Sequence, residues 1–115
     1  MTYFLNVKEK SDLKAIYRKL SLAYHPDKGG ELKKMQAINE EYNMLKNNFG
    51  IFPKDLRKVK IGNFVFVNKS LCIVFKVEEK LFYAKSFNTG RVAMFEKDTG
   101  YGLFNFKIRA YVEQK

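Results

Sequence analysis

Few side chains in this sequence could take part in chemistry, and their spacing does not assemble a catalytic or metal site. The chain has one His and one Cys, whereas a tetrahedral zinc site needs about four ligands. Cys72 lies in an apolar segment without a basic neighbour, which predicts a buried structural thiol rather than a nucleophile. The carboxylates follow no catalytic spacing, and the sequence contains no phosphate-binding Gly-rich loop. We therefore expect no enzyme activity, no metal and no cofactor.

The exception is the tripeptide His25-Pro26-Asp27, which is followed directly by a Lys-Gly-Gly run at 28–30. Proline lacks a backbone donor, and it pushes the residue before it out of the helical region. A helix that precedes the tripeptide must therefore end near Tyr24. The sequence predicts that the tripeptide lies in a loop.

Two apolar stripes flank this loop. Upstream, apolar and aromatic residues recur every three or four positions at Leu13, Ile16, Tyr17, Leu20 and Tyr24. Downstream, the same helical spacing is found at Leu32, Met35, Ile38, Tyr42 and Leu45. Ser11 is a candidate N-cap for the first helix, and the negative charge of Asp12 suits its first turn. Two striped helices joined by a short polar loop bury their stripes by folding back antiparallel, which predicts a helical hairpin with the loop at its tip.

Together these features resemble the J-domain family of DnaK-type co-chaperones. The resemblance covers residues 3–47 and is carried by the segments YFLNV, LKAIYRKLSLAYHPDKGG and MQAINEEYNML, which occur in the family's order. The family's first helix is reduced to about one turn at residues 3–7, and no fourth helix follows Leu45, so the resemblance is to a minimal J domain. The Lys-Gly-Gly run and the immediate start of the next helix are similar to polyomavirus T antigens and to mitochondrial import-motor J proteins.

The resemblance implies a function and a set of chaperone-binding residues. A J domain docks on a DnaK-type chaperone and triggers its ATP hydrolysis. The residues that match the family's trigger are His25, Pro26 and Asp27, and Asp27 would pair with an Arg of the ATPase. The helix positions that match those facing the acidic surface of the partner are Lys14, Tyr17, Arg18 and Lys19. A helical wheel independently places Lys14 and Arg18 on one flank and turns Leu22 away from the core, where an apolar side chain suits a partner contact.

The pattern of the sequence changes after Gly50, where the helical period gives way to alternation. The candidate strands are Lys58–Ile61, Phe64–Asn68, Leu71–Val77, Leu81–Phe87, Arg91–Glu96 and Leu103–Val112. Segments rich in Gly, Asn and Asp separate them, as β-hairpins require. Five or six short strands within about sixty residues predict one small antiparallel β-barrel of the SH3-like type, whose closure removes exposed edges. The predicted fold is therefore α+β, with a minimal J domain over residues 1–50 and a β-barrel domain over residues 51–115.

The basic charge is concentrated in the predicted barrel. Residues 1–50 carry nine Lys and Arg against six Asp and Glu, and residues 51–115 carry thirteen against six, so the net charges are +3 and +7. In the last predicted strand, an apolar core face alternates with a basic outer face. The apolar members are Phe104, Phe106, Ile108, Ala110 and Val112. The candidate nucleic-acid or partner-binding residues of the outer face are Lys107, Arg109 and Tyr111, with Phe82, Tyr83 and Tyr101 as further surfaces for stacking. A solvated basic surface on a protein-binding or purely structural barrel is the alternative.

Because the sequence shows no targeting signal, we expect a cytoplasmic protein, or one in the host cytoplasm if the protein is viral. The sequence shows no signal peptide, its longest apolar run is far below the roughly 18 residues of a membrane span, and one Cys cannot form an internal disulfide. We expect a co-chaperone that recruits and stimulates a DnaK-type ATPase through residues 12–30 and uses the barrel to select a client protein or a location. One alternative is a nucleic-acid-binding adaptor that recruits the chaperone. Another is a viral or phage protein that occupies the chaperone of its host.

Overall fold

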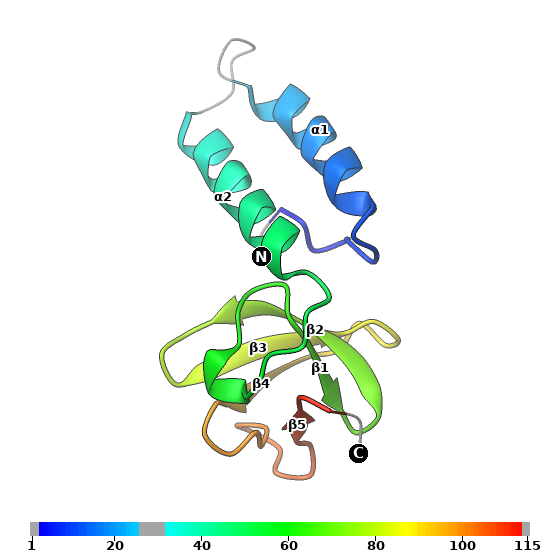
Figure 1. The fold of residues 1–115 in the computed structure, drawn as a ribbon, viewed down its shortest axis with the longest axis vertical. Helices are drawn as coiled ribbons and strands as arrows, with labels where there is room; N and C mark the ends of the chain where they lie inside the picture. The colour runs from blue at the N-terminus through cyan, green and yellow to red at the C-terminus, as the bar shows by residue number, and fades with distance from the viewer. Residues whose placement is uncertain (1–2, 26–31, 114–115) are drawn as a thin grey trace. The chain divides into compact units, whose positions relative to one another are not determined.

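The structure, a computed structural model, describes residues 3–25 and 32–113. The chain divides into two compact units, Met1–Asn47 and Asn48–Lys115. Helices build the first, here called the helical unit, and strands build the second, the sheet unit (Figure 1). The fold is α+β, as the sequence predicts.

The helical unit is a hairpin of α1 (Asp12–Tyr24) and α2 (Leu32–Asn48), which run antiparallel (Figure 1). α1 ends at Tyr24 as predicted, because His25 before the proline is extended, with φ −63° and ψ 132°. Ser11 occupies the N-cap position of α1 as predicted, but its side chain makes no capping hydrogen bond. Instead, the Asp12 carboxylate accepts backbone N–H groups of the preceding segment, from residue 8 at 3.2 Å and residue 9 at 3.0 Å.

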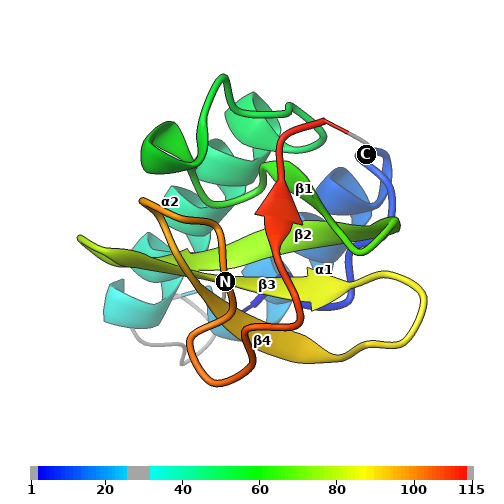
Figure 2. The ribbon, with the colours of Figure 1, turned by 90° about the horizontal axis from the view of Figure 1, so that it is seen from below.

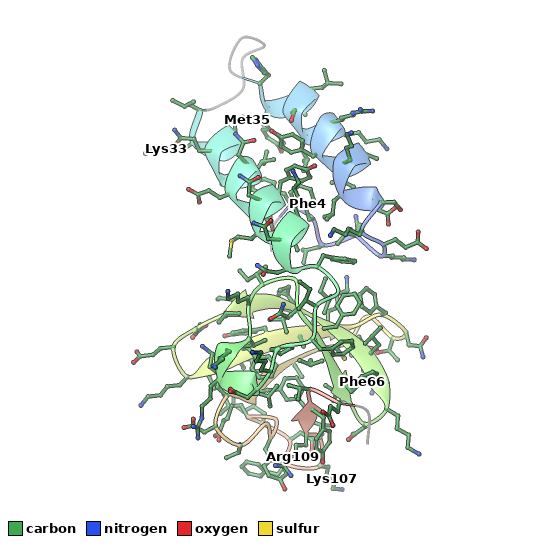
Figure 3. The ribbon with its side chains drawn as sticks, viewed as in Figure 1. Phe4, Lys33, Met35, Phe66, Lys107 and Arg109 are labelled. Carbon is green, nitrogen blue, oxygen red and sulfur yellow. The ribbon has the colours of Figure 1, made fainter. Side chains whose placement is uncertain are left out.

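The core of the helical unit is formed by both helices and by the segment that precedes them. Its buried apolar residues are Phe4, Val7, Leu13, Met35, Ile38 and Leu45. Residues 3–7, expected as a shortened helix, make a single turn in which the Val7 N–H donates to the Phe4 carbonyl (3.2 Å). This turn buries Phe4 completely, beside the hairpin (Figure 3). The Tyr3 N–H also donates to the carboxylate of Glu41, a buried residue of α2 (2.8 Å), so the short segment is fixed to the hairpin.

The sheet unit contains one five-stranded antiparallel sheet in the order β4-β3-β2-β1-β5. The strands are β1 (Phe64–Val67), β2 (Ser70–Val77), β3 (Leu81–Ser86), β4 (Val92–Glu96) and β5 (Ala110–Tyr111). Asn68 and Lys69 join β1 to β2 with positive φ angles of 49° and 73°, as a two-residue type I′ turn requires. Isolated bridges pair residue 95 with residue 102 and residue 101 with residue 109, so backbone pairing continues from β4 to β5. In Figure 2, β5 crosses the direction of the other strands, and the sheet curls on itself.

The sheet encloses a small apolar core. Its buried members are Val59, Val65, Cys72, Val74, Phe82, Ala84, Phe95 and Ala110. Phe82 and Phe95 lie directly opposite each other on β3 and β4, and their rings stack with centroids 5.4 Å apart. The suggestion that Phe82 is a surface for stacking is therefore wrong, because its side chain is fully buried.

The predicted strand Lys58–Ile61 does not form. The chain makes the short 3₁₀ helix η2 (Leu56–Lys58) followed by a turn. Asp55 starts η2 by accepting the Arg57 N–H at 2.7 Å, and the Asn63 side chain accepts the Lys60 N–H at 2.9 Å. These local side-chain contacts compete with strand pairing and prevail over the apolar alternation.

The predicted strand Leu103–Val112 shrinks to the two residues of β5. The Gly102 N–H donates to the Ile108 carbonyl (3.0 Å), which closes residues 103–107 into a loop. A Cβ at Gly102 would lie 2.6 Å from the Asn105 carbonyl oxygen, so this close approach needs glycine. Phe104 and Phe106, predicted as core, are consequently 83% and 73% exposed.

Candidate functional site

The outer side of α1 presents most of the chaperone-binding residues that the sequence predicts. Lys14, Arg18 and Lys19 are exposed, and the Leu22 side chain is 63% exposed. Successive residues four positions apart share a helix flank, so residues 14, 18 and 22 form one stripe that leads toward the C-terminal end of α1. α1 therefore combines cationic and apolar contact groups on one exposed flank.

Tyr17, unlike these residues, faces α2. Its ring stacks on Tyr42 with centroids 4.2 Å apart and planes 11° apart, and its hydroxyl donates to the Asn39 side chain. The residue thus joins the two helices, and it positions the exposed flank of α1. The sequence reasoning missed Asn39, because a polar residue at a single helix position carries no pattern that predicts its partner.

The tip of the hairpin begins at His25, which is exposed with an extended backbone. Pro26 and Asp27, the other two residues of the predicted trigger, lie outside the described residues. Just before the tip, the Tyr24 ring meets the ring of Tyr3 edge-on at 6.2 Å, and the Lys34 Nζ lies 5.6 Å above it. Tyr24 therefore connects the N-terminal segment, α1 and α2 at the point where His25 leaves the helix.

Comparison with known protein families matches residues 4–49 to the DnaJ domain. Residues 4–49 form a DnaJ domain. A protein similar to part of this chain is the small t antigen of Budgerigar fledgling disease virus, which is 52% identical over 29 residues. That match covers 25% of this chain and 20% of the small t antigen. No solved structure matches the chain. The contact residues that the sequence predicts lie within this domain, on α1 and at His25 among the described residues.

Membrane-spanning helices and metal clusters are both missing from the part of the chain that the structure describes. Among the described residues, no helix has the length and apolar character that crossing a membrane requires. Over residues 3–25 and 32–113, no group of three or more His, Cys, Asp and Glu side chains is arranged to hold a metal ion.

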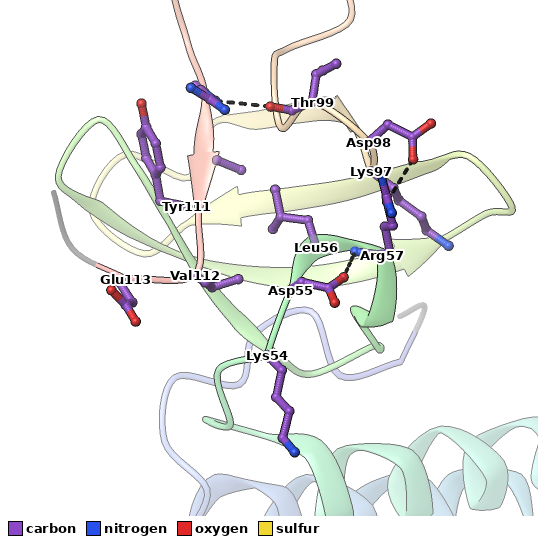
Figure 4. A pocket seen from close by; sticks show the side chains of 12 residues that line it. Lys54, Asp55, Leu56, Arg57, Lys97, Asp98, Thr99, Tyr111, Val112 and Glu113 are labelled. Carbon is purple, nitrogen blue, oxygen red and sulfur yellow. Dashed lines mark hydrogen bonds and ion pairs between the residues drawn. The ribbon is translucent and has the colours of Figure 1, made fainter.

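In the sheet unit, Arg109 is engaged with neighbouring groups of the same unit. Its guanidinium lies between two aromatic rings, 4.8 Å from the centroid of Tyr101 and 5.3 Å from that of Tyr111. Its Nε also donates to the Thr99 carbonyl at 3.0 Å. The dashed line at Thr99 in Figure 4 marks this hydrogen bond. Cation–π contacts of this kind hold the cation in place. Arg109 and Tyr111 thus come together as their alternation predicts, whereas Tyr101 joins them only through the curl of the sheet.

Lys107 does not share a strand face with Arg109. It lies in the loop before β5 with an exposed side chain, and its backbone N–H donates to the Asn105 side chain (3.0 Å). Figure 3 shows both basic side chains near β5, but Lys107 lies in a turn and Arg109 in an isolated bridge just before the strand. The prediction of a continuous basic face along residues 103–112 is therefore wrong.

A hollow of about 610 Å³ lies beside β5 and η2. Its walls carry charges of both signs, among them the ion pair of Arg57 with Asp98 at 3.1 Å and the Asp55 side chain that caps η2 (Figure 4). The mixture gives this hollow no preference for an anionic or a cationic ligand.

Cys72 is a structural thiol, as predicted. It is a buried member of the core, and burial raises the pKa of its thiol from 9.0 to about 11. A thiol that resists ionisation in this way is a poor nucleophile at neutral pH.

Proposed function

We propose that this protein is a co-chaperone that binds a DnaK-type chaperone and stimulates its ATP hydrolysis. The DnaJ domain over residues 4–49 is the observation that carries this proposal. The exposed flank of Lys14, Arg18 and Leu22, which runs toward His25, supports it as a contact surface. In this role the protein regulates the catalysis of its partner and performs none of its own.

We further propose that the sheet unit selects a client protein or a location for the chaperone, and that the protein works in the cytoplasm. A second candidate is a viral protein that occupies the chaperone of its host. The partial identity with a viral small t antigen supports this candidate. The two candidates share the docking surface and differ in what the sheet unit brings to the chaperone.

The proposed function is tested by single-turnover ATP hydrolysis of a purified DnaK-type chaperone, with and without this protein. We expect stimulation by the wild type and none by H25Q. Because His25 is an exposed residue outside the helix, its replacement should change the free energy of unfolding by less than about 0.5 kcal/mol.

The matched control is K60E, which alters an exposed residue of the sheet unit and should stimulate like the wild type. A folded wild-type protein that stimulates none of the DnaK-type chaperones of its own cell, or of its host, would overturn the proposal. The viral candidate predicts stimulation of the host's chaperone in particular.

A further inference from the structure

A second hollow in the sheet unit, with a volume of about 600 Å³, opens beside the loop of residues 102–108. Its floor reaches the core, because Cys72, Ala84 and Phe95 line it and are at most 4% exposed. Leu103 and Ile108 line it from the loop. Ligand sites are typically concave, largely apolar and about 300–1,000 Å³ in volume, so this hollow has the character of a binding site.

The rim of this hollow exposes large apolar side chains. Phe104 lines the hollow yet is 83% exposed, and Val92 lines it and is 55% exposed. Phe106 follows on the same loop and is 73% exposed. Hydrogen bonds hold this loop in shape, from the Gly102 N–H to the Ile108 carbonyl (3.0 Å) and from the Ile108 N–H to the Asn105 carbonyl (3.3 Å). Aromatic side chains held so far out of a core beside an apolar hollow are typical of an interaction surface.

The charge around the hollow is positive. Arg91 is the one charged side chain among the described residues that line it, and Lys107 lies on the loop next to Phe106. Within residues 3–25 and 32–113, neither side chain forms an ion pair with a carboxylate. Residues 51–115 also carry a net charge of +7. This surface therefore attracts an acidic partner and repels a second copy of itself.

We propose that the hollow binds an extended polypeptide segment in which an apolar side chain is flanked by Asp or Glu. The apolar side chain fills the hollow under Phe104, and the flanking carboxylates lie near Arg91 and Lys107. A concave apolar site is filled by a projecting apolar group, and an extended polypeptide presents its side chains to pockets in this way. The inference rests on the partner-selecting role proposed above for the sheet unit, and it names the chemistry of the partner.

The test measures binding of the full chain to a labelled synthetic peptide with Leu and Phe at its centre and Asp and Glu at both ends. We expect F104S to weaken binding by about tenfold or more, since truncating an exposed aromatic side chain that the bound partner covers has effects of that size. R91E should weaken binding severalfold at low salt and less at high salt. The matched controls I51S, at a residue 54% exposed in the same unit, and K60E should bind like the wild type.

Several outcomes would overturn the inference. These are no wild-type binding at about 1 mM peptide, equal binding of a peptide whose Leu and Phe are replaced by Ser, and unchanged binding by F104S. Stronger binding to vesicles of anionic lipid than to the peptide, lost in F104S, would also overturn it. The chaperone's ATP hydrolysis is measured in parallel: F104S should still stimulate it, and H25Q should still bind the peptide. Failure of one assay alone therefore shows which of the two proposals is wrong.

Discussion

At the scale of single residues, side chains of the same type have different roles because their surroundings differ. Arg18 is exposed on α1, where its charge is available to a partner. Arg109 lies between two Tyr rings and donates to the Thr99 carbonyl, so its charge is already engaged within the sheet unit. These contacts distinguish an arginine that is available to a partner from one that stabilises its own unit.

The role of Arg18 can be tested by charge reversal. We expect R18E to slow association with a DnaK-type chaperone by about tenfold at low salt, because surface charges mainly act on the association rate. For the wild type, binding should weaken as the salt concentration rises from about 0.15 to 0.5 M. Stopped-flow association kinetics measure both effects, with K60E as the matched control in the sheet unit. Binding that is independent of salt would point instead to an apolar contact at Leu22.

The buried thiol predicts a dependence of stability on pH. The pKa of Cys72 is raised in the folded protein to about 11, from 9.0 for an ordinary thiol, so the unfolded chain ionises first as the pH rises. The contribution of Cys72 to stability is therefore complete below pH 9.0 and is lost progressively toward pH 11. Urea unfolding measured across this pH range should show a smaller loss in the free energy of unfolding for C72A than for the wild type. Rapid alkylation of the native thiol near neutral pH would contradict its burial.

At the scale of elements, the hairpin is held together by contacts between its two helices rather than by the helices alone. The stack of Tyr17 on Tyr42 and the hydrogen bond to Asn39 join α1 to α2 across one face. The exposed flank of α1 depends on this packed face, because a helix of 13 residues is marginal without tertiary packing. Exposed residues, proposed as docking residues, and packing residues thus alternate along one element.

Substitutions at Tyr17 separate its hydrogen bond from its packing. We expect Y17F to lower the free energy of unfolding of the helical unit by about 1 kcal/mol and Y17A by about 3–5 kcal/mol. Urea unfolding followed by far-ultraviolet circular dichroism measures both changes. Y83F is the control, because its hydroxyl bonds Glu78 at the surface and should matter less. An equal loss in the free energy of unfolding for Y17F and Y83F would show that the hydrogen bond to Asn39 contributes nothing to stability.

At the scale of the whole molecule, charge is distributed unevenly between the two halves, with +3 on residues 1–50 and +7 on residues 51–115. A net positive charge attracts nucleic acid in general. Retention near physiological salt, however, needs several cationic side chains arranged in a row along the phosphate backbone. The described residues near β5 do not supply such a row, because Arg109 is engaged and Lys107 lies in a loop.

We therefore expect no retention of the full chain on single-stranded or duplex nucleic acid at about 0.15 M salt. Fluorescence anisotropy with labelled oligonucleotides, titrated with salt, measures this. A K107A variant should leave the weak binding at low salt nearly unchanged. The slope of the logarithm of affinity against the logarithm of salt concentration should also stay nearly the same. Sub-micromolar binding whose slope falls by about one in K107A would favour the nucleic-acid-binding adaptor instead.

The sequence by itself determined the features that depend on local pattern. The apolar spacing of three and four residues predicted both helices, and proline at position 26 predicted the end of α1 at Tyr24. Alternation and turn residues predicted β1 to β4 to within a residue or two at each end, including the turn at Asn68 and Lys69. In each case the interactions that decide the conformation lie between residues close in the sequence, so their spacing alone reveals them.

Only the tertiary structure decided the remaining features. Residues 103–112 alternate like a strand, but the Gly102–Ile108 hydrogen bond folds residues 103–107 into a loop that exposes Phe104. Tyr17 matches a docking position, yet it packs against Tyr42 because α2 returns alongside α1. The meeting of Tyr101 with Arg109 likewise depends on the curl of the sheet. These contacts join residues that no short-range pattern relates, and they form only when the chain closes on itself and buries its core.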